Sequence, residues 1–173
     1  MEIISAGEKA YESIESYADN PEAREAFRSI GEEWLIKYFN GSDPADEEQL
    51  SNPQKIIDDG GYICLVRKDG AIVGAGGLLN RLNRGVGGDV VYEIIKMGVR
   101  ERCQGLGIGR AILAHLISRA RVIPGIRSLK IETSSKLTAA LSMYRKFGFV
   151  DDPSIQLSFH GYKDADIFLH LPL

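Results

Sequence analysis

Hydrophobic residues along the 173-residue chain follow two spacings, one typical of strands and one typical of helices. The contrast is clearest in the middle of the chain. Residues 90–99 are rich in β-branched and aromatic side chains, which predicts a strand. The next apolar residues recur at the spacing of one helix face, which predicts an amphipathic helix: Ile108, Ile112, Leu113, Leu116 and Ile117.

A glycine-rich turn joins this strand to this helix, and it reads Gln104-Gly105-Leu106-Gly107-Ile108-Gly109. Such a turn directs backbone N–H groups and the positive end of the helix dipole at one point, where phosphate is the natural occupant. Glycine suits the turn because a side chain would keep phosphate oxygens away from the backbone. Arg110, at the helical end, is a candidate for an additional phosphate contact, with a solvent-facing side chain as the alternative.

Two common phosphate-binding motifs fit this turn poorly. A P-loop ends in Gly-Lys-Ser/Thr, whereas Gly109 is followed by Arg110-Ala111. A dinucleotide fingerprint needs a third glycine where the chain has Arg110, although Glu132 lies near the distance expected for its acidic residue. A tight turn that caps a helix without any ligand is the remaining structural alternative.

The region before residue 62 reads mainly as helix. Residues 3–4 predict a short strand, residues 8–17 a weak helix, and residues 19–21 the start of a longer helix ended by Asn40-Gly41. Apolar residues on one face of the longer helix predict core packing: Phe27, Ile30, Trp34 and Tyr38. The acidic run at residues 43–48 predicts a solvated helix start, with attraction of a cationic acceptor as the alternative.

The remaining segments predict a mixed sheet. Residues 62–67 and 71–79 read as strands joined by an Asp-Gly hairpin turn, and glycines in the second strand predict a bulge or a close backbone contact. Residues 127–132 predict a strand, and residues 136–147 a helix that Gly148 ends. The last predicted strands are residues 155–159 and 166–171. We therefore predict one mixed α/β domain, residues 1–173, with helices on both faces of its sheet.

Composition narrows the classes of function. With 21 basic and 24 acidic residues the formal net charge is −3, which argues against a nucleic-acid or anionic-membrane binder. The first residues lack the features of a signal peptide, and no stretch approaches the length of a membrane span. Cys64 reads as a buried thiol, and a reduced, cytoplasmic setting is the default expectation. Neither Cys64 with Cys103 nor the three histidines have metal-ligand spacing: His115, His160 and His170.

Two motifs resemble those of the GNAT superfamily of N-acetyltransferases. Gln104-x-x-Gly107-x-Gly109, five residues after Val99, resembles its acetyl-CoA pyrophosphate loop, Gln/Arg-x-x-Gly-x-Gly/Ala. Residues 140–149, with Tyr144 before Gly-Phe, resemble its second signature, and residues 92–99 resemble its central strand. Together with the hairpin, the resemblance covers roughly residues 62–150. It implies a mostly antiparallel sheet that splays at its middle, with acetyl-CoA as cosubstrate in the opening.

The resemblance also implies which residues hold the coenzyme. The backbone groups of Met97 and Val99 would pair with the pantetheine amides like an added strand, and an N–H near Gly98 would stabilise the oxyanion. Gly98 inside a strand suggests a bulge, with accommodation of a neighbouring side chain as the alternative. Many relatives use an Asn near the later helix, where this chain offers Ser134 and Leu137, so the Ser134 hydroxyl is the predicted replacement. The loop contacts are Gln104, Gly105, Leu106, Gly107, Ile108, Gly109 and Arg110.

Tyr144 is the general acid that the resemblance implies. A phenol that titrates near ~10 stays protonated at neutral pH and can donate a proton to a departing thiolate, whose thiol titrates near ~8.5. The alternative is an aromatic side chain that fills the interface between sheet and helix, with its hydroxyl bonded to backbone.

Glu93 is the candidate general base, because some family members use a strand carboxylate six residues before the position of Val99. Without a bulge it would share a strand face with three later residues: Ile95, Met97 and Val99. Proton transfer from a lysine-like amine to an ordinary carboxylate is uphill by ~6 pKa units, about 8 kcal/mol, and an α-amine narrows this to about 5 kcal/mol. The structural alternative is a salt bridge to one of three basic residues: Lys96, Arg81 or Arg84.

The sequence thus predicts an N-acetyltransferase that moves acetyl directly from acetyl-CoA to a primary amine of a small molecule, peptide or protein. No covalent intermediate is needed, because Cys103 follows the strand rather than lying beside an evident base. No metal, nucleic acid or membrane is expected, and a homodimer stays open. The alternatives are a non-catalytic acyl-CoA-binding or sensory module and a nucleotide-binding domain.

Overall fold

The computed structural model describes residues 9–81, 90–152, 154 and 162–173. Among these residues seven strands form one sheet in the order β1-β2-β3-β4-β5-β7-β6. The strands are β1 (Ser13–Ser16), β2 (Tyr62–Lys68), β3 (Ala71–Asn80), β4 (Val90–Val99), β5 (Ile126–Thr133), β6 (Val150–Asp151) and β7 (Ile167–Pro172). The helices are α1 (Ala23–Phe39), α2 (Pro44–Ser51), α3 (Pro53–Asp58), α4 (Ile108–Arg121) and α5 (Thr138–Lys146), with short 3-10 turns η1 (Tyr17–Asp19) and η3 (Glu101–Cys103).

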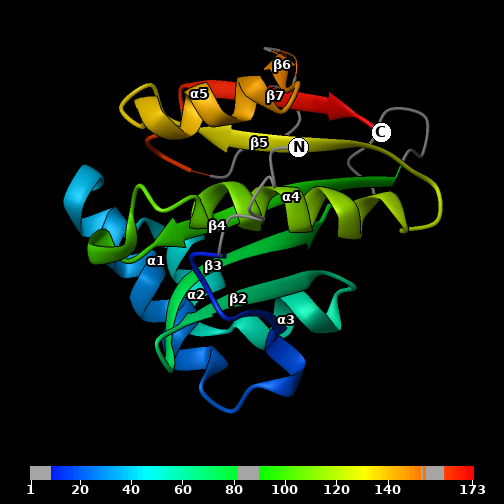
Figure 1. Ribbon diagram of the computed structural model, residues 1–173. Helices are drawn as coiled ribbons and strands as arrows, with labels where there is room; N and C mark the ends of the chain where they lie inside the picture. The colour runs from blue at the N-terminus through cyan, green and yellow to red at the C-terminus, as the bar shows by residue number, and fades with distance from the viewer. Residues whose placement is uncertain (1–8, 82–89, 153, 155–161) are drawn as a thin grey trace, which may run out of the picture.

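Helices cover both faces of the sheet, as the sequence predicts (Figure 1). Helices α1, α2 and α3 pack on one face around a core that includes Phe27, Ile30 and Leu50. Helices α4 and α5 pack on the other face, where all five apolar residues of the predicted α4 stripe are buried. No helix in the described part of the chain is both long and apolar enough to cross a membrane.

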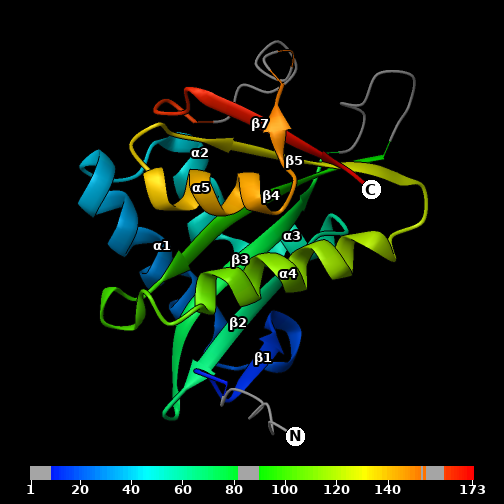
Figure 2. The same cartoon turned by 45° about the horizontal axis from the view of Figure 1, so that its top comes forward.

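The sheet splits at its centre. Strands β4 and β5 are the one parallel pair among the described neighbours, and their pairing runs only from Val90 with Ile126 to Glu93 with Lys130. Among the described strands, β4 beyond Glu93 pairs only with β3, and β5 beyond Lys130 pairs only with β7. Figure 2 shows the two strands diverging toward their carboxyl ends. The predicted splayed, mostly antiparallel sheet is confirmed.

A β-bulge next to the split changes which side chains share a face. Ala75 pairs with Gly98 and Gly77 pairs with Ile95. The single β3 residue between Ala75 and Gly77 therefore opposes two residues of β4, Lys96 and Met97. One of these two, Lys96, has a left-handed backbone with φ 48°. After the bulge, Met97 packs with the core under α4, whereas Ile95 packs with the core under α1. The face that Glu93 would share with Ile95, Met97 and Val99 in the absence of a bulge is therefore not formed, because the bulge moves Met97 and Val99 to the other side of the sheet.

Other differences from the predicted elements lie near the chain ends. Residues 13–16 form strand β1, paired with β2, where the sequence suggested a weak helix. The pairing partner lies about 50 residues away, so local propensity could not report it. The strands predicted at residues 3–4 and 155–159 lie outside the described residues, and the two-residue β6 was not predicted. Helix α5 begins at Thr138 with no side-chain cap, two residues later than expected.

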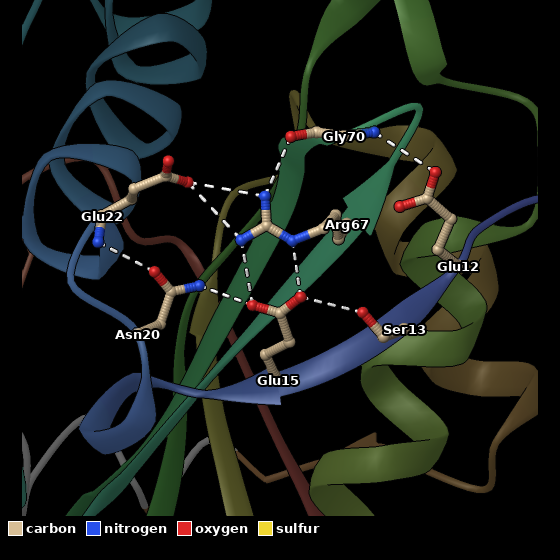
Figure 3. A network of polar contacts seen from close by, with 7 residues as sticks. All are labelled: Glu12, Ser13, Glu15, Asn20, Glu22, Arg67 and Gly70. Carbon is tan, nitrogen blue, oxygen red and sulfur yellow. Dashed lines mark hydrogen bonds and ion pairs between the residues drawn. The ribbon is translucent and has the colours of Figure 1, made fainter.

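Arg67 anchors the N-terminal edge of the sheet (Figure 3). Its guanidinium donates from Nε to Glu15 Oε1 at 2.6 Å and from Nη2 to Glu15 Oε2 at 3.1 Å. It also donates to Glu22 and to the carbonyl oxygen of Gly70. Asn20 completes this cluster, because its side chain donates to Glu15 and accepts from the Glu22 backbone N–H. The Arg67 cluster, defined by these residues, joins β1, the start of α1 and the β2–β3 hairpin.

Candidate active site

A cleft of about 520 Å³, the large cleft, opens where β4 separates from β5. Its walls come from the end of β4, the glycine-rich turn, the start of α4, one face of α5 and the end of α1. The lining side chains and backbone include Trp34, Tyr38, Met97, Gly98, Val99, Cys103, Gln104, Gly105, Gly107, Ile108, Gly109, Arg110, Lys136, Leu137, Met143 and Tyr144. The structure thus brings most of the predicted coenzyme contacts to one surface.

The turn at residues 104–109 presents open backbone at the helix start. Gly105 and Gly107 have φ of 77° and 81°, and in the described part of the chain only the glycine itself and its two chain neighbours have atoms within 4 Å of the position that a Cβ would take on either. Gln104 Nε2 donates to the carbonyl oxygen of Val99 at 3.1 Å and so fixes the turn against the strand end. Because α4 has no side-chain cap, the N–H groups of its first turn are available to an anion.

The side chains of the turn play different parts. Ile108 is buried in the core, so only its backbone can reach a ligand, and Leu106 is exposed. Arg110 lines the large cleft with its guanidinium 5.1 Å from the centre of the Phe147 ring. Lys136 also lines the large cleft and is a second cation there, which the sequence analysis did not identify.

The edge of β4 that faces the split carries the predicted thioester contacts. Residues 94–99 have no strand partner on the β5 side, and Met97, Gly98 and Val99 line the large cleft. Both interpretations of Gly98 hold. The bulge lies directly before it, and a Cβ on Gly98 would approach Trp34 Cδ1 to 2.9 Å, so the glycine also makes room for α1.

Tyr144 lies on α5 between two cavities. It lines the large cleft and also a cavity of about 60 Å³ between β4 and β5, the split cavity. Its ring is buried against Phe149, with 6.1 Å between ring centres, and burial raises the pKa of its hydroxyl to about 12. No group in the described part of the chain hydrogen-bonds this hydroxyl. The alternative, in which the Tyr144 hydroxyl bonds a backbone group, is therefore not observed among the described residues.

An acidic pocket of about 60 Å³ lies beside the large cleft and shares Trp34 and Leu137 with it. Four carboxylates line this acidic pocket: Asp43, Asp46, Glu132 and Asp164. Glu132 and Tyr162 also line the split cavity, so the three spaces follow one another around the split. Buried Ser134 lies on the wall of the acidic pocket and is not among the residues that line the large cleft. Its predicted pantetheine contact stays a prediction.

Glu93 is fully buried and ion-paired with Arg81, whose Nε donates to Glu93 Oε2 at 2.6 Å. Of the three partners anticipated for Glu93, Arg81 is the one that the structure shows, Lys96 pairs elsewhere, and Arg84 lies outside the described residues. Glu93 does not line the large cleft, the split cavity or the acidic pocket. Its role as a base stays a prediction.

Lys96 is a buried cation that the sequence analysis considered only as a partner of Glu93. Its ammonium bonds Asp46 of α2 and lies 4.3 Å from the centre of the Tyr162 ring. Burial lowers the pKa of Lys96, which the nearby carboxylates of Asp46 and Glu93 oppose. A lysine in a strand whose other residues, apart from Glu93, are apolar or aromatic was the available signal, but its partner 50 residues away was not evident from the sequence.

Within the described residues, no three His, Cys, Asp or Glu side chains come together as metal ligands. A mixed sheet that splits beside an uncapped helix N-terminus, over a cleft of this size, has the geometry and the room to accommodate a phosphate-bearing cosubstrate. The protein-family model described as "Acetyltransferase (GNAT) family" matches residues 27–149, which is most of the chain. The chain therefore belongs to the GNAT family of acetyltransferases.

Similar proteins agree with this assignment. N-alpha-acetyltransferase RimI from Mycobacterium tuberculosis is 34% identical over 115 residues, which cover 64% of this chain and 65% of that protein. A GNAT-family acetyltransferase from Staphylococcus aureus Mu50 superposes with a TM-score of 0.78 at 23% identity, over 93% of this chain and 98% of that one. A phosphinothricin acetyltransferase from Sinorhizobium meliloti, solved in complex with AcCoA, has a TM-score of 0.66 at 17% identity, over 93% and 88% of the two chains. The two structures establish the fold.

Proposed function

We propose that this protein transfers an acetyl group from acetyl-CoA directly to a primary amine. One observation carries the proposal: a single cleft runs from an open anion-binding turn to a buried tyrosine at the split of the sheet. In this arrangement the N–H groups around Gly107 hold the diphosphate, with Arg110 beside it. The pantetheine lies along the free edge of β4, and the thioester reaches Met97 and Gly98.

The amine approaches from the acidic pocket. Its carboxylates attract a cationic amine, and Glu132 connects this pocket to the split cavity that Tyr144 lines. Glu132 is therefore our first candidate for the group that accepts the amine proton. Glu93, which is ion-paired with Arg81, is the second candidate. The relative named N-alpha-acetyltransferase supports an α-amine as the first acceptor to test. Such an amine also loses its proton more easily than a lysine side chain.

The acyl transfer makes one bond and breaks another. After the ammonium has given its first proton to the base, the nitrogen lone pair attacks the thioester carbonyl and the C–N bond forms. The nitrogen then releases its second proton to water, and the C–S bond breaks with its electrons on sulfur. Complete transfer of the Tyr144 proton, from a pKa of about 12 to a thiol near ~8.5, would cost about 5 kcal/mol. Tyr144 therefore acts mainly by donating a hydrogen bond to the departing sulfur, and the coenzyme leaves with a proton taken finally from solvent.

The test combines coenzyme binding with thiol release. Acetyl-CoA should raise the melting temperature, and free thiol should appear with at least one amine of a panel of alanine amide, a short peptide, Nα-acetyllysine amide and spermidine. Tyr144→Phe should keep the thermal shift and lower turnover by about 10²-fold. Tyr62→Phe is the matched control, since Tyr62 bonds His115 and does not line the large cleft.

Parallel variants separate the two candidate bases. Glu132→Gln should lower turnover more than Glu93→Gln at equal coenzyme binding, and the reverse order would return the base to Glu93. Thermal stabilisation without thiol release from any amine would favour a non-catalytic acyl-CoA-binding or sensory module. Displacement of the coenzyme by ATP or NAD, with no effect of CoA, would favour a nucleotide-binding domain.

A further inference from the structure

Lys96 occupies an unusual position, at the point where the sheet opens. Its left-handed backbone, φ 48°, is costly for a residue other than glycine and is kept only where the surroundings enforce it. Its side chain, 3% exposed, pairs with the 7% exposed Asp46. A buried ion pair is seldom more stable than a well-packed apolar pair of the same size. The cost of this arrangement suggests a role beyond stability.

The surroundings of Lys96 connect the acceptor side to the thioester side. Asp46 lines the acidic pocket, whereas Lys96 itself lines the split cavity together with Met97 and Tyr144. Tyr162 lies over the ammonium and is held by Gln49 of α2 at 2.9 Å. The Lys96 charge thus lies between the place where the amine enters and the place where it reacts.

The charges near this position are unequal. The acidic pocket has four carboxylates, of which Asp46 pairs with Lys96, while Glu132 interacts electrostatically with Arg81. With Glu93, the ion-pair partner of Arg81, five carboxylates and the two cations Lys96 and Arg81 give a formal balance of −3. The other polar groups that line the split cavity within the described residues are the phenols of Tyr162 and Tyr144. Every additional negative charge here would hold the proton on a bound ammonium more firmly.

We propose that Lys96 is a positioning residue of the acceptor site, whose positive charge, maintained by its bond to the Asp46 carboxylate, offsets the carboxylates of the acidic pocket and so lets the bound amine lose its proton before it attacks the thioester. This inference rests on the proposed function and adds an electrostatic determinant to it. Burial supports it in one respect, because water cannot screen a charge held at 3% exposure as it screens a surface lysine. The acceptors that suit such a site are cationic amines without a carboxylate beside the amino group, since a further anion would be repelled.

The test is the pH dependence of kcat at saturating acceptor, which reports groups in the complex. The acceptor is the panel amine that wild type turns over fastest. Lys96→Met should move the acidic limb up by about one pH unit, as the loss of one charge roughly 12 Å from the amine implies for an effective dielectric near 20. Asp46→Asn should move it down, and Lys96→Met/Asp46→Asn, which restores the charge balance, should return it to the wild-type position. Lys96→Arg should match wild type.

These outcomes separate charge from structure. If Lys96→Met fails to fold, Asp46→Asn still shows the direction in which the acidic limb moves, and the double variant still shows whether the limb returns to its wild-type position. The role of Lys96 is overturned if the acidic limb of the kcat profile lies at the same pH in all variants, or if its position does not follow the net charge of the variants. In either case, turnover by wild type still supports the proposed acetyltransferase activity. Absence of thiol release from wild type with every amine overturns the proposed function instead. The acetyl-CoA thermal shift should be equal in all variants, because Lys96 does not line the large cleft.

Discussion

Two groups of charged side chains join distant parts of this chain, and they differ most in their access to water. In the Arg67 cluster at the sheet edge, Arg67 and Glu15 keep 23% and 27% of their side-chain surface exposed. In the Lys96–Asp46 pair at the split, the exposed fractions are 3% and 7%. Arg67 has several partners and water nearby, whereas Lys96 has one carboxylate and one aromatic ring.

From this difference we infer a structural role for the Arg67 cluster and a functional role for the Lys96–Asp46 pair. If one partner of the Arg67 cluster is lost, water can hydrate the others, so the cluster is tolerant and its contribution is modest. If one partner of the buried pair is lost, the other stays charged without compensation. A protein gains little stability from such a pair over apolar packing, which is why its location at the split points to chemistry rather than to folding.

The largest expected effect is on the buried pair. Lys96→Met leaves Asp46 charged and buried, so the free energy of unfolding should fall by about 3–5 kcal/mol in urea titrations. Lys96→Met/Asp46→Asn, which removes both charges, should recover at least half of the loss. If Lys96→Met is as stable as wild type, the Lys96–Asp46 pair is hydrated in solution, and the difference from the Arg67 cluster disappears.

A smaller effect is expected at the sheet edge. Arg67→Met removes the anchor of β1 but leaves carboxylates that water can reach, so the melting temperature should fall by about 3 °C. The matched control is Arg145→Met, since Arg145 pairs with Asp151 on the open surface and should change the melting temperature by less than about 1 °C. An Arg67 effect as large as that of Lys96 would mean that the cluster is as poorly hydrated as the buried pair.

The smallest effect is a pH dependence within the Arg67 cluster. The hydrogen bond from Arg67, before any other cause, lowers the pKa of Glu15. A carboxyl group with a lowered pKa contributes stability above its unfolded value of about 4.3, and that contribution is lost as the pH falls through its folded value. The difference in melting temperature between wild type and Glu15→Gln should therefore be full at pH 7 and should close in acid. A difference that persists at pH 3 would assign the effect to packing rather than to charge.

The strand–turn–helix segment was predictable because all its signals are local. The β-branched run, the glycines of the turn and the apolar stripe of α4 each report on neighbours within a few residues. The structure confirms the strand at Val90–Val99, the helix beginning at Ile108 and the helix end at Gly148. The motifs in this segment also indicated the family, which the family model confirms.

The parts that the sequence missed depend on contacts between distant residues. Strand β1 is four residues long and exists because β2 pairs with it. The bulge at Lys96 follows from the register with β3, and it moves Met97 to the face opposite Ile95. A change of face after one inserted residue is invisible to periodicity, because the alternation on each side of it looks regular.

The sequence by itself determined the turn that we propose as the anchor of the coenzyme, since glycines and a helix start expose backbone N–H groups through local geometry alone. Only the tertiary structure decided the composition of the acidic pocket, the proposed acceptor side. There the charges of α2, β4 and β5 meet, and the pairing of Lys96 with Asp46 and of Arg81 with Glu93 depends on how three elements pack. Electrostatic interactions act through space, so which charge a residue faces is fixed by the fold and not by its neighbours along the chain.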